Sequence, residues 1–194
     1  MYYGIYQNLR NSTWQCFLDF HIRSLPVDLL GISRAVDVPI IPNSRVGELL
    51  PHELGKTYCD GKHWVIIYDD TLPLKRARFV VAHELGHYLL GHNVSFTKYA
   101  ANATASGRSP AERQADHFAA RLLCPACVLW GLCVQSPEEI EQLCLVDAQT
   151  ARQRFRRMKT LYTRNRFLQD SLEKQVYEQF LPYIQATKES FTAK

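Results

Sequence analysis

The most informative segment of the chain is Val80-Val81-Ala82-His83-Glu84-Leu85-Gly86-His87-Tyr88-Leu89. Residues four apart lie on the same face of a helix, so His83 and His87 can direct two imidazole rings at one metal ion. Glu84 is rotated by about 100° from His83. Glu84 can therefore lie beside the metal and take a proton from a metal-bound water. The spacing His-Glu-x-x-His predicts a helix that carries a metal site.

The residues around this motif indicate that the helix is buried. From Val80 to Leu90, Glu84 is the only Asp, Glu, Lys or Arg. Polar groups buried without partners cost roughly 2–7 kcal/mol, so this histidine pair and Glu84 need strong partners. We expect Thr71 to cap the helix, Pro73 to lie in its first turn and Gly91 to close it. The competing interpretation is that hydrogen bonds within the core satisfy both histidines.

Length and composition limit the class of protein. A chain of 194 residues, 46% of them hydrophobic, can form one domain, alone or with an appendage. The net charge of +4 does not by itself indicate nucleic acid, and six cysteines do not resemble a disulfide scaffold. The start Met1-Tyr2-Tyr3-Gly4 does not resemble a signal peptide, and no apolar segment reaches the ~20 residues needed to span a bilayer. We therefore expect a soluble, cytoplasmic protein.

The segments before the motif predict two helices and a hairpin. Helices at about 6–20 and 26–36 are expected to support the site by packing alone. Asp60-Gly61 is a strong hairpin signal between the runs 56–59 and 63–68. The second run is rich in β-branched and aromatic residues and predicts a buried strand. As an edge strand it could hold an extended peptide. The polar stretch 92–109 predicts a loop.

A second helix, over residues 111–123, is expected to complete the site. Ser109-Pro110 gives its start and Pro125 its end, while Ala115, Phe118, Ala119 and Leu122 form an inward stripe. Glu112 and Asp116 are four residues apart and share a face beside this stripe. Two acids in such a place indicate a cation between them and the histidines. The alternative is a solvated face on which the acids pair with Arg113 or Arg121.

Catalytic zinc usually has three protein ligands and one water, so His83 and His87 leave one ligand to be found. Metzincins place a third histidine six residues after the second, but that position is Asn93. A glutamate from a following helix is the remaining arrangement, and Glu112 is the best candidate. Asp116, one turn later, could accept a hydrogen bond from a ring nitrogen of a ligating histidine.

Two motifs of this chain resemble the ImmA/IrrE family of metallopeptidases. They are His83-Glu84-Leu85-Gly86-His87 and Glu112-x-x-Ala115-Asp116-x-Phe118-Ala119-Ala120-x-Leu122-Leu123-Cys124-Pro125. The hairpin strand and Arg78-Phe79 add to a similarity that runs from roughly Pro26 to Met158. Cys124 differs, because the family commonly has Met there. The resemblance implies an α+β fold: a mainly helical zincin-like domain with a small β-sheet, followed by a helical C-terminal part.

The resemblance also implies an activity. It implies zinc (Zn²⁺) on His83, His87 and Glu112, with Glu84 as the general base of an endopeptidase. The implied substrate is a helix-turn-helix repressor of the XRE type, whose cleavage would release mobile-element or stress-response genes. A metal-containing regulator that binds DNA or a repressor without cutting it is the alternative. The oxyanion donor could be Tyr88, Tyr99 or His117.

The C-terminal region predicts a helix-turn-helix-like pair at about 137–159 and an amphipathic helix at about 163–186. The second helix of the pair carries Arg152, Arg154, Arg156, Arg157 and Lys159, which could meet phosphates. Leu145 replaces the usual turn glycine and the arginines point to all sides, so packing or partner docking is favoured over DNA binding. We place the domain boundary after residue 130, giving a peptidase domain at 1–130 and a helical region at 131–194.

The cysteines allow two interpretations. Cys124 and Cys127 have the spacing of half a zinc site, with Cys133 and Cys144 further along the chain. However, Cys124 ends a helix whose apolar side packs inward, and Leu and Val surround the pair. Buried structural thiols are therefore the favoured interpretation.

Overall fold

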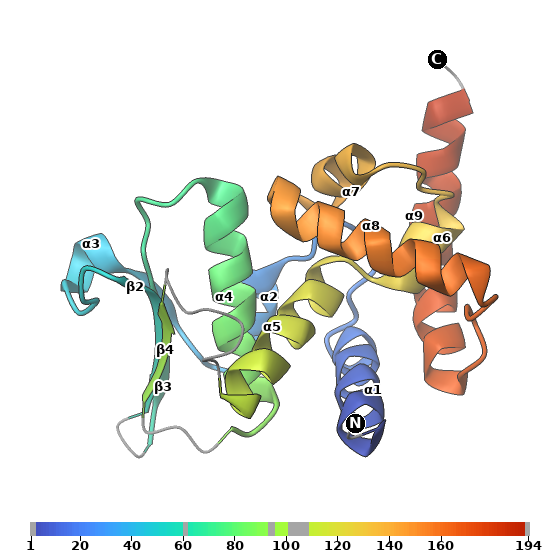
Figure 1. Ribbon diagram of the computed structural model, residues 1–194. Helices are drawn as coiled ribbons and strands as arrows, with labels where there is room; N and C mark the ends of the chain where they lie inside the picture. Colours follow the sequence, from blue (N-terminus) through green and yellow to red (C-terminus); the bar gives the residue numbers. More distant parts are fainter. Residues whose placement is uncertain (1–2, 60–61, 93–95, 101–108, 193–194) are drawn as a thin grey trace. The chain divides into compact units, whose positions relative to one another are not determined.

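The computed structural model describes residues 3–59, 62–92, 96–100 and 109–192. The chain forms two compact units, which we call the sheet unit (residues 28–119) and the helical unit (residues 1–27 and 120–194). Helices predominate and one small sheet is present (Figure 1), which confirms the predicted α+β fold with a helical C-terminal part. Among the described residues, none of the helices combines the length and apolarity needed to cross a membrane.

The sheet unit contains a four-stranded sheet. Its strands are β1 (Ile40–Pro42), β2 (Glu53–Cys59), β3 (Trp64–Tyr68) and β4 (Phe96–Ala100), in the order β1-β3-β2-β4. β1 and β3 are parallel, while β2 is antiparallel to both β3 and β4. The β2–β3 pairing confirms the predicted hairpin, whose expected turn residues, Asp60 and Gly61, lie outside the described residues.

Two expectations about this sheet are wrong. β3 is not an edge strand, because it pairs with β1 on one side and β2 on the other. The stretch 92–109 is not all loop, because its residues 96–100 form β4 on the other side of β2. Both errors have the same physical cause. Whether a segment joins a sheet depends on strands distant in sequence, and the polar composition of 92–109 hides that pairing.

The motif helix, α4 (Leu74–Leu89), packs on β2 and β3 and also contacts α2 (Leu29–Ala35); a short helix, α3 (Asn43–Val46), precedes β2. The start of α4 differs from the prediction. Pro73 occupies the capping position, and Thr71 instead donates a hydrogen bond to Asp69. Proline at this point cannot donate a backbone hydrogen bond, so it ends the preceding loop. The predicted end is confirmed, since Gly91 has a φ of 64° and its amide bonds to the carbonyl of Tyr88.

The second site helix, α5 (Pro110–Leu123), begins as predicted, with the Ser109 hydroxyl accepting the amide of Glu112. Its inward stripe is confirmed, because Ala115, Phe118, Ala119 and Leu122 are all buried. α5 lies tightly against α4 at Gly86. A Cβ added to Gly86 would lie 3.2 Å from the Phe118 ring and 3.4 Å from the Cα of Ala115. Small residues on both helices therefore set how closely the two helices approach.

The helical unit is built around its last helix. Its elements are α1 (Tyr3–Asp19), α6 (Ala126–Gly131), α7 (Pro137–Cys144), α8 (Ala148–Thr163) and α9 (Ser171–Thr192), and α9 packs against α1 and α6. Phe17 and Phe180 meet edge to face at 5.7 Å, and Gln179 donates hydrogen bonds to the carbonyls of Phe17 and Ile22. These contacts confirm that the C-terminal stripe docks within the chain, with Val176, Phe180 and Ile184 buried.

The predicted start of the last helix is wrong. The helix begins at Ser171 and not near 163, and Leu168 lies before it with a φ of 53°. Asp170 explains the start, because its side chain accepts the amide of Leu172 and its carbonyl accepts that of Lys174. Pro182 lies within the helix, which continues to Thr192.

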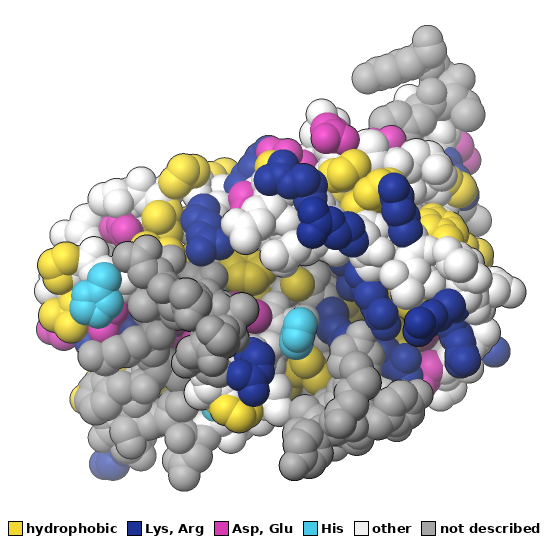
Figure 2. Space-filling model, in the orientation of Figure 1, with side chains coloured by type: hydrophobic (Ala, Val, Ile, Leu, Met, Phe, Trp, Pro, Cys, Tyr) yellow, Lys and Arg dark blue, Asp and Glu magenta, His cyan; other side chains and the backbone are white. Residues whose placement is uncertain are grey.

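The α7–α8 pair has the outline of a helix-turn-helix. Ser136 and Glu139 form the predicted capping box, and Asp147 caps α8. Leu145 adopts a left-handed conformation in the turn, with a φ of 53°. Figure 2 shows Lys and Arg side chains gathered over the α8 face, where Arg152 is exposed. Arg154, in contrast, lines a cavity. The basic residues of α8 are thus divided between two surroundings. Packing or partner docking stays the favoured prediction, with DNA binding as the alternative.

The thiols are mostly buried. Cys16, Cys124, Cys127 and Cys144 are buried, Cys59 is partly so, and Cys133 is exposed. Burial raises the pKa of Cys127 to about 12, and burial together with the charge of Asp19 does the same for Cys16. Among the described residues, no cysteine belongs to a group of three side chains able to hold a metal. This fits the favoured interpretation of structural thiols.

We expect a disulfide reagent to separate these thiols by rate. The thiolate is the reactive form, so a thiol whose pKa is near 12 reacts very slowly at neutral pH, and burial slows it further. Cys133 should react first, while Cys16 and Cys127 should react only after unfolding. Mass spectrometry of the native protein locates the label, and Cys133→Ser should remove the fast phase. Rapid native labelling of Cys127 would contradict its buried position.

Candidate metal centre

The two histidines of the motif converge as their spacing predicts. Both lie on α4 and both are fully buried. Their Nε2 atoms are 3.0 Å apart, and their rings meet at 66° with centroids separated by 4.8 Å. Two ring nitrogens at this distance repel each other unless a proton or a cation lies between them. The two histidines are therefore positioned to share a proton or to bind a metal cation.

Glu112 of α5 reaches both rings. Its Oε2 lies 3.2 Å from Nε2 of His83, and its Oε1 lies 3.3 Å from Nε2 of His87. The three residues offer one ligand atom each, all within 4.8 Å of one another. This proximity depends on the close packing of α4 and α5 at Gly86. Two imidazole nitrogens and a carboxylate oxygen are a donor set that suits zinc and related divalent metals.

The charges around His83, His87 and Glu112 favour a bound cation. Burial lowers the pKa of His83, but hydrogen bonds to Asp116 and Glu112 outweigh it and raise that pKa to about 9. Burial raises the pKa of Glu112, but hydrogen bonds from His83 and His87 lower it to about 2. The surrounding carboxylates thus favour a positive charge at His83. The same negative charges would stabilise a metal ion.

Each ring is oriented through its Nδ1 atom. Asp116 Oδ1 lies 3.0 Å from Nδ1 of His83, as the sequence predicted for one of the two histidines. His92 Nδ1 lies 2.9 Å from Nδ1 of His87, and His92 Nε2 lies 2.9 Å from Oε1 of Gln114. If His92 Nε2 donates to Gln114, its Nδ1 accepts from His87. That tautomer leaves Nε2 of His87 free to bind a metal.

Sequence reasoning missed the role of His92 and did not single out Gln114. His92 is predicted there only as part of the loop at 92–109. Two signals could have found them. His92 directly follows Gly91, which reverses the chain at the end of α4 and returns it toward His87. Gln114 is on the same helix as Glu112. Neither signal predicts which side chains are in contact, because the contacts depend on how α4 and α5 cross.

Glu84 is fully buried beside the histidines. The Thr57 hydroxyl donates a hydrogen bond to its Oε2, so β2 helps to orient the carboxylate. The charge of Glu84 contributes to the raised pKa of His83, which indicates that it lies near the ring. Gly55 of β2 makes this packing possible, because an added Cβ would collide with Val80 and lie 3.2 Å from Oε1 of Glu84.

The oxyanion donor stays a prediction among three residues. Tyr88 packs its ring against Trp64 at 5.5 Å, edge to face. His117 is exposed on α5. Tyr99 lies in β4, where its backbone is opposite Gly55 in the sheet register.

Comparison with known families agrees with this geometry. Residues 46–158, more than half of the chain, match the family model Peptidase_M78, described as the IrrE N-terminal-like domain. A peptidase domain of this kind acts on a polypeptide, and the cluster of His83, His87 and Glu112 lies within the matched range. The chain belongs to this metallopeptidase family. The comparison with curated proteins finds no match.

Proposed function

We propose that this protein is a zinc-dependent endopeptidase, with His83, His87 and Glu112 as the metal ligands. The observation that carries the proposal is the convergence of these three donor atoms within 4.8 Å, with both histidines buried. Two nitrogens and one carboxylate leave a fourth position of a tetrahedral zinc ion open for water. The donor chemistry therefore fits a catalytic zinc site better than a closed structural site.

Glu84 is proposed as the general base. When bound, zinc lowers the pKa of a coordinated water toward about 7 and polarises the scissile carbonyl. Glu84 would accept a proton from the attacking water and pass it to the leaving amine. Its burial and its hydrogen bond from Thr57 hold the carboxylate in one orientation, which supports this role. Asp116 and His92 act as positioning residues, because each fixes the tautomer of a ligating histidine.

The substrate is proposed to be a helix-turn-helix repressor of the XRE type. Membership of a peptidase family supports a polypeptide substrate. The resemblance to ImmA/IrrE proteins supports a transcriptional repressor as that polypeptide. Cleavage would inactivate the repressor and release the genes that it controls. The basic face of α8 could also contact DNA, which is the feature that favours the alternative of a non-cleaving regulator.

Incubation with a purified helix-turn-helix repressor of the XRE type tests both proposals. We expect fragments to appear with zinc and to be absent after chelation, followed by recovery when zinc is restored. Electrophoresis and mass spectrometry of the fragments identify the cleaved bond. A stable complex without fragments, formed with metal-loaded protein, would contradict the peptidase proposal and favour the non-cleaving regulator.

A further inference from the structure

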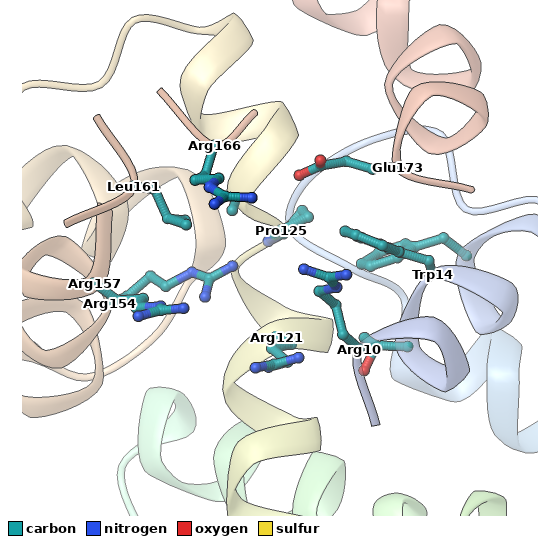
Figure 3. Close-up of a pocket in the computed structure, with 12 residues that line it drawn as sticks. Arg10, Trp14, Arg121, Pro125, Arg154, Arg157, Leu161, Arg166 and Glu173 are labelled. Carbon is teal, nitrogen blue, oxygen red and sulfur yellow. The ribbon is translucent and has the colours of Figure 1, made fainter. Parts of the chain in front are cut away.

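A cavity of about 60 Å³ lies within the helical unit (Figure 3). Its lining brings together charged side chains from α1, α5, α8, α9 and the segment between α8 and α9. Five arginines and one glutamate are among the lining residues: Arg10, Arg121, Arg154, Arg157, Arg166 and Glu173. Guanidinium groups therefore outnumber carboxylates strongly in this lining. Such a lining offers several guanidinium donors to an anion of matching size.

Arg10 shows how the guanidinium groups are held. Its guanidinium carbon lies 4.7 Å from the centre of the Trp14 ring, and one terminal nitrogen lies 3.7 Å from a carboxylate oxygen of Asp170. Its Nε atom is buried and has no hydrogen-bond acceptor among the described residues. Trp14 is itself buried, so the aromatic ring fixes the arginine in place. A donor that is fixed and buried in this way is prepared for an acceptor from a ligand.

The size of the cavity limits the ligand. A water-sized group needs about 10–15 Å³ of cavity volume, so the cavity has room for about four to six non-hydrogen atoms. A phosphoryl group has this size. Arginine forks match its oxygens with paired hydrogen bonds. Arg157 and Arg166 are exposed, so the rim of the cavity reaches solvent and the remainder of a larger ligand could extend outward.

We propose that this cavity binds the phosphoryl group of a small anionic ligand, with Arg10, Arg154 and Arg157 as donors. The ligand is either inorganic phosphate or a phosphorylated small molecule such as a nucleotide. Glu173 is compatible with such a ligand. Burial raises the pKa of its carboxyl, so protonation of Glu173 beside an anion costs less than for an exposed glutamate. The proposal does not depend on the metal centre.

Isothermal titration of the full chain with inorganic phosphate, pyrophosphate and adenosine monophosphate tests the proposal. We expect saturable binding of one phosphate per chain at constant ionic strength. The rim substitutions Arg157→Gln and Arg166→Gln together should weaken it about tenfold or more, since a hydrogen bond to a charged group has that effect. Both residues are exposed, so the variant should fold. Tighter binding of adenosine monophosphate than of phosphate would identify a nucleotide as the source of the phosphoryl group.

Arg152→Gln is the matched control, because Arg152 is exposed on α8 and does not line the cavity. This variant should bind phosphate as the unchanged protein does. Equal weakening by the rim pair and by Arg152→Gln would overturn the proposal, because it would show a diffuse surface field. So would absence of saturable binding by all three compounds. Tight binding of duplex DNA that depends equally on Arg152 would assign these arginines to nucleic acid instead.

Discussion

Glu84→Gln is expected to abolish most cleavage and to leave the bound metal in place. The amide keeps the size of the side chain but cannot accept a proton, and general base catalysis contributes about 10²–10⁴-fold to a rate. The rate of repressor cleavage should therefore fall by about that factor. Thr57 can still donate its hydrogen bond to the amide oxygen of the variant. Zinc content, measured by plasma mass spectrometry, should stay at one ion per chain.

Glu178→Gln is a suitable control for this substitution. Glu178 is exposed on α9, so the same chemical change there should alter neither rate nor zinc content. A Glu84→Gln protein that cuts at the normal rate would end the assignment of a general base. Loss of zinc from that variant would instead move Glu84 into the metal-binding set.

Glu112→Gln is expected to have the second large effect, which falls on metal affinity. The Glu112 carboxylate contacts both imidazoles, and its negative charge would neutralise part of the charge of the ion. Outer partners of metal ligands change affinity by about 10–100-fold, so loss of a direct ligand should cost at least about 100-fold. Competition with a fluorescent zinc chelator measures the change. Cleavage should be lost at zinc concentrations that saturate the unchanged protein.

The zinc affinity of Asp116→Asn gives a reference against which the effect of Glu112→Gln can be compared. Asp116 contacts His83 through Nδ1 and not through the side that faces Glu112. Its substitution should weaken zinc binding by about 10–100-fold, less than Glu112→Gln does. If Asp116→Asn weakened zinc binding more than Glu112→Gln did, Asp116 would be the metal ligand and Glu112 the residue that orients a ligating histidine. Unchanged zinc affinity in Glu112→Gln would remove Glu112 from the site.

The proximity of His83 and His87 could be predicted because it depends on the spacing of residues within one helix. The four-residue interval places His83 and His87 together on any regular helix. Ala115 lies on the predicted inward stripe, and the structure shows that its counterpart on α4 is Gly86. Glu112 could be selected because an acid beside an apolar stripe needs a partner.

The remaining features depend on tertiary contacts. His92 reaches His87 because of the reversal at Gly91, and Gln114 meets His92 because of the crossing of α4 and α5. β4 is part of a polar segment whose pairing with β2 gives no periodic signal. The start of α9 was predicted too early because the apolar stripe with a period of four already includes Leu168, which lies before the helix start that Asp170 marks.

The contact of Gly86 with Phe118 and Ala115 affects the size of the metal ion that the proposed site would hold. A hydrogen atom on one α-carbon sets the spacing between two helices, and the three donor atoms are attached to those helices. Bond lengths to zinc are about 2.0–2.2 Å for nitrogen and carboxylate oxygen, whereas calcium requires about 2.3–2.6 Å and more ligands. In the proposed zinc site we therefore expect backbone packing, as well as the chemistry of the ligands, to select the ionic radius.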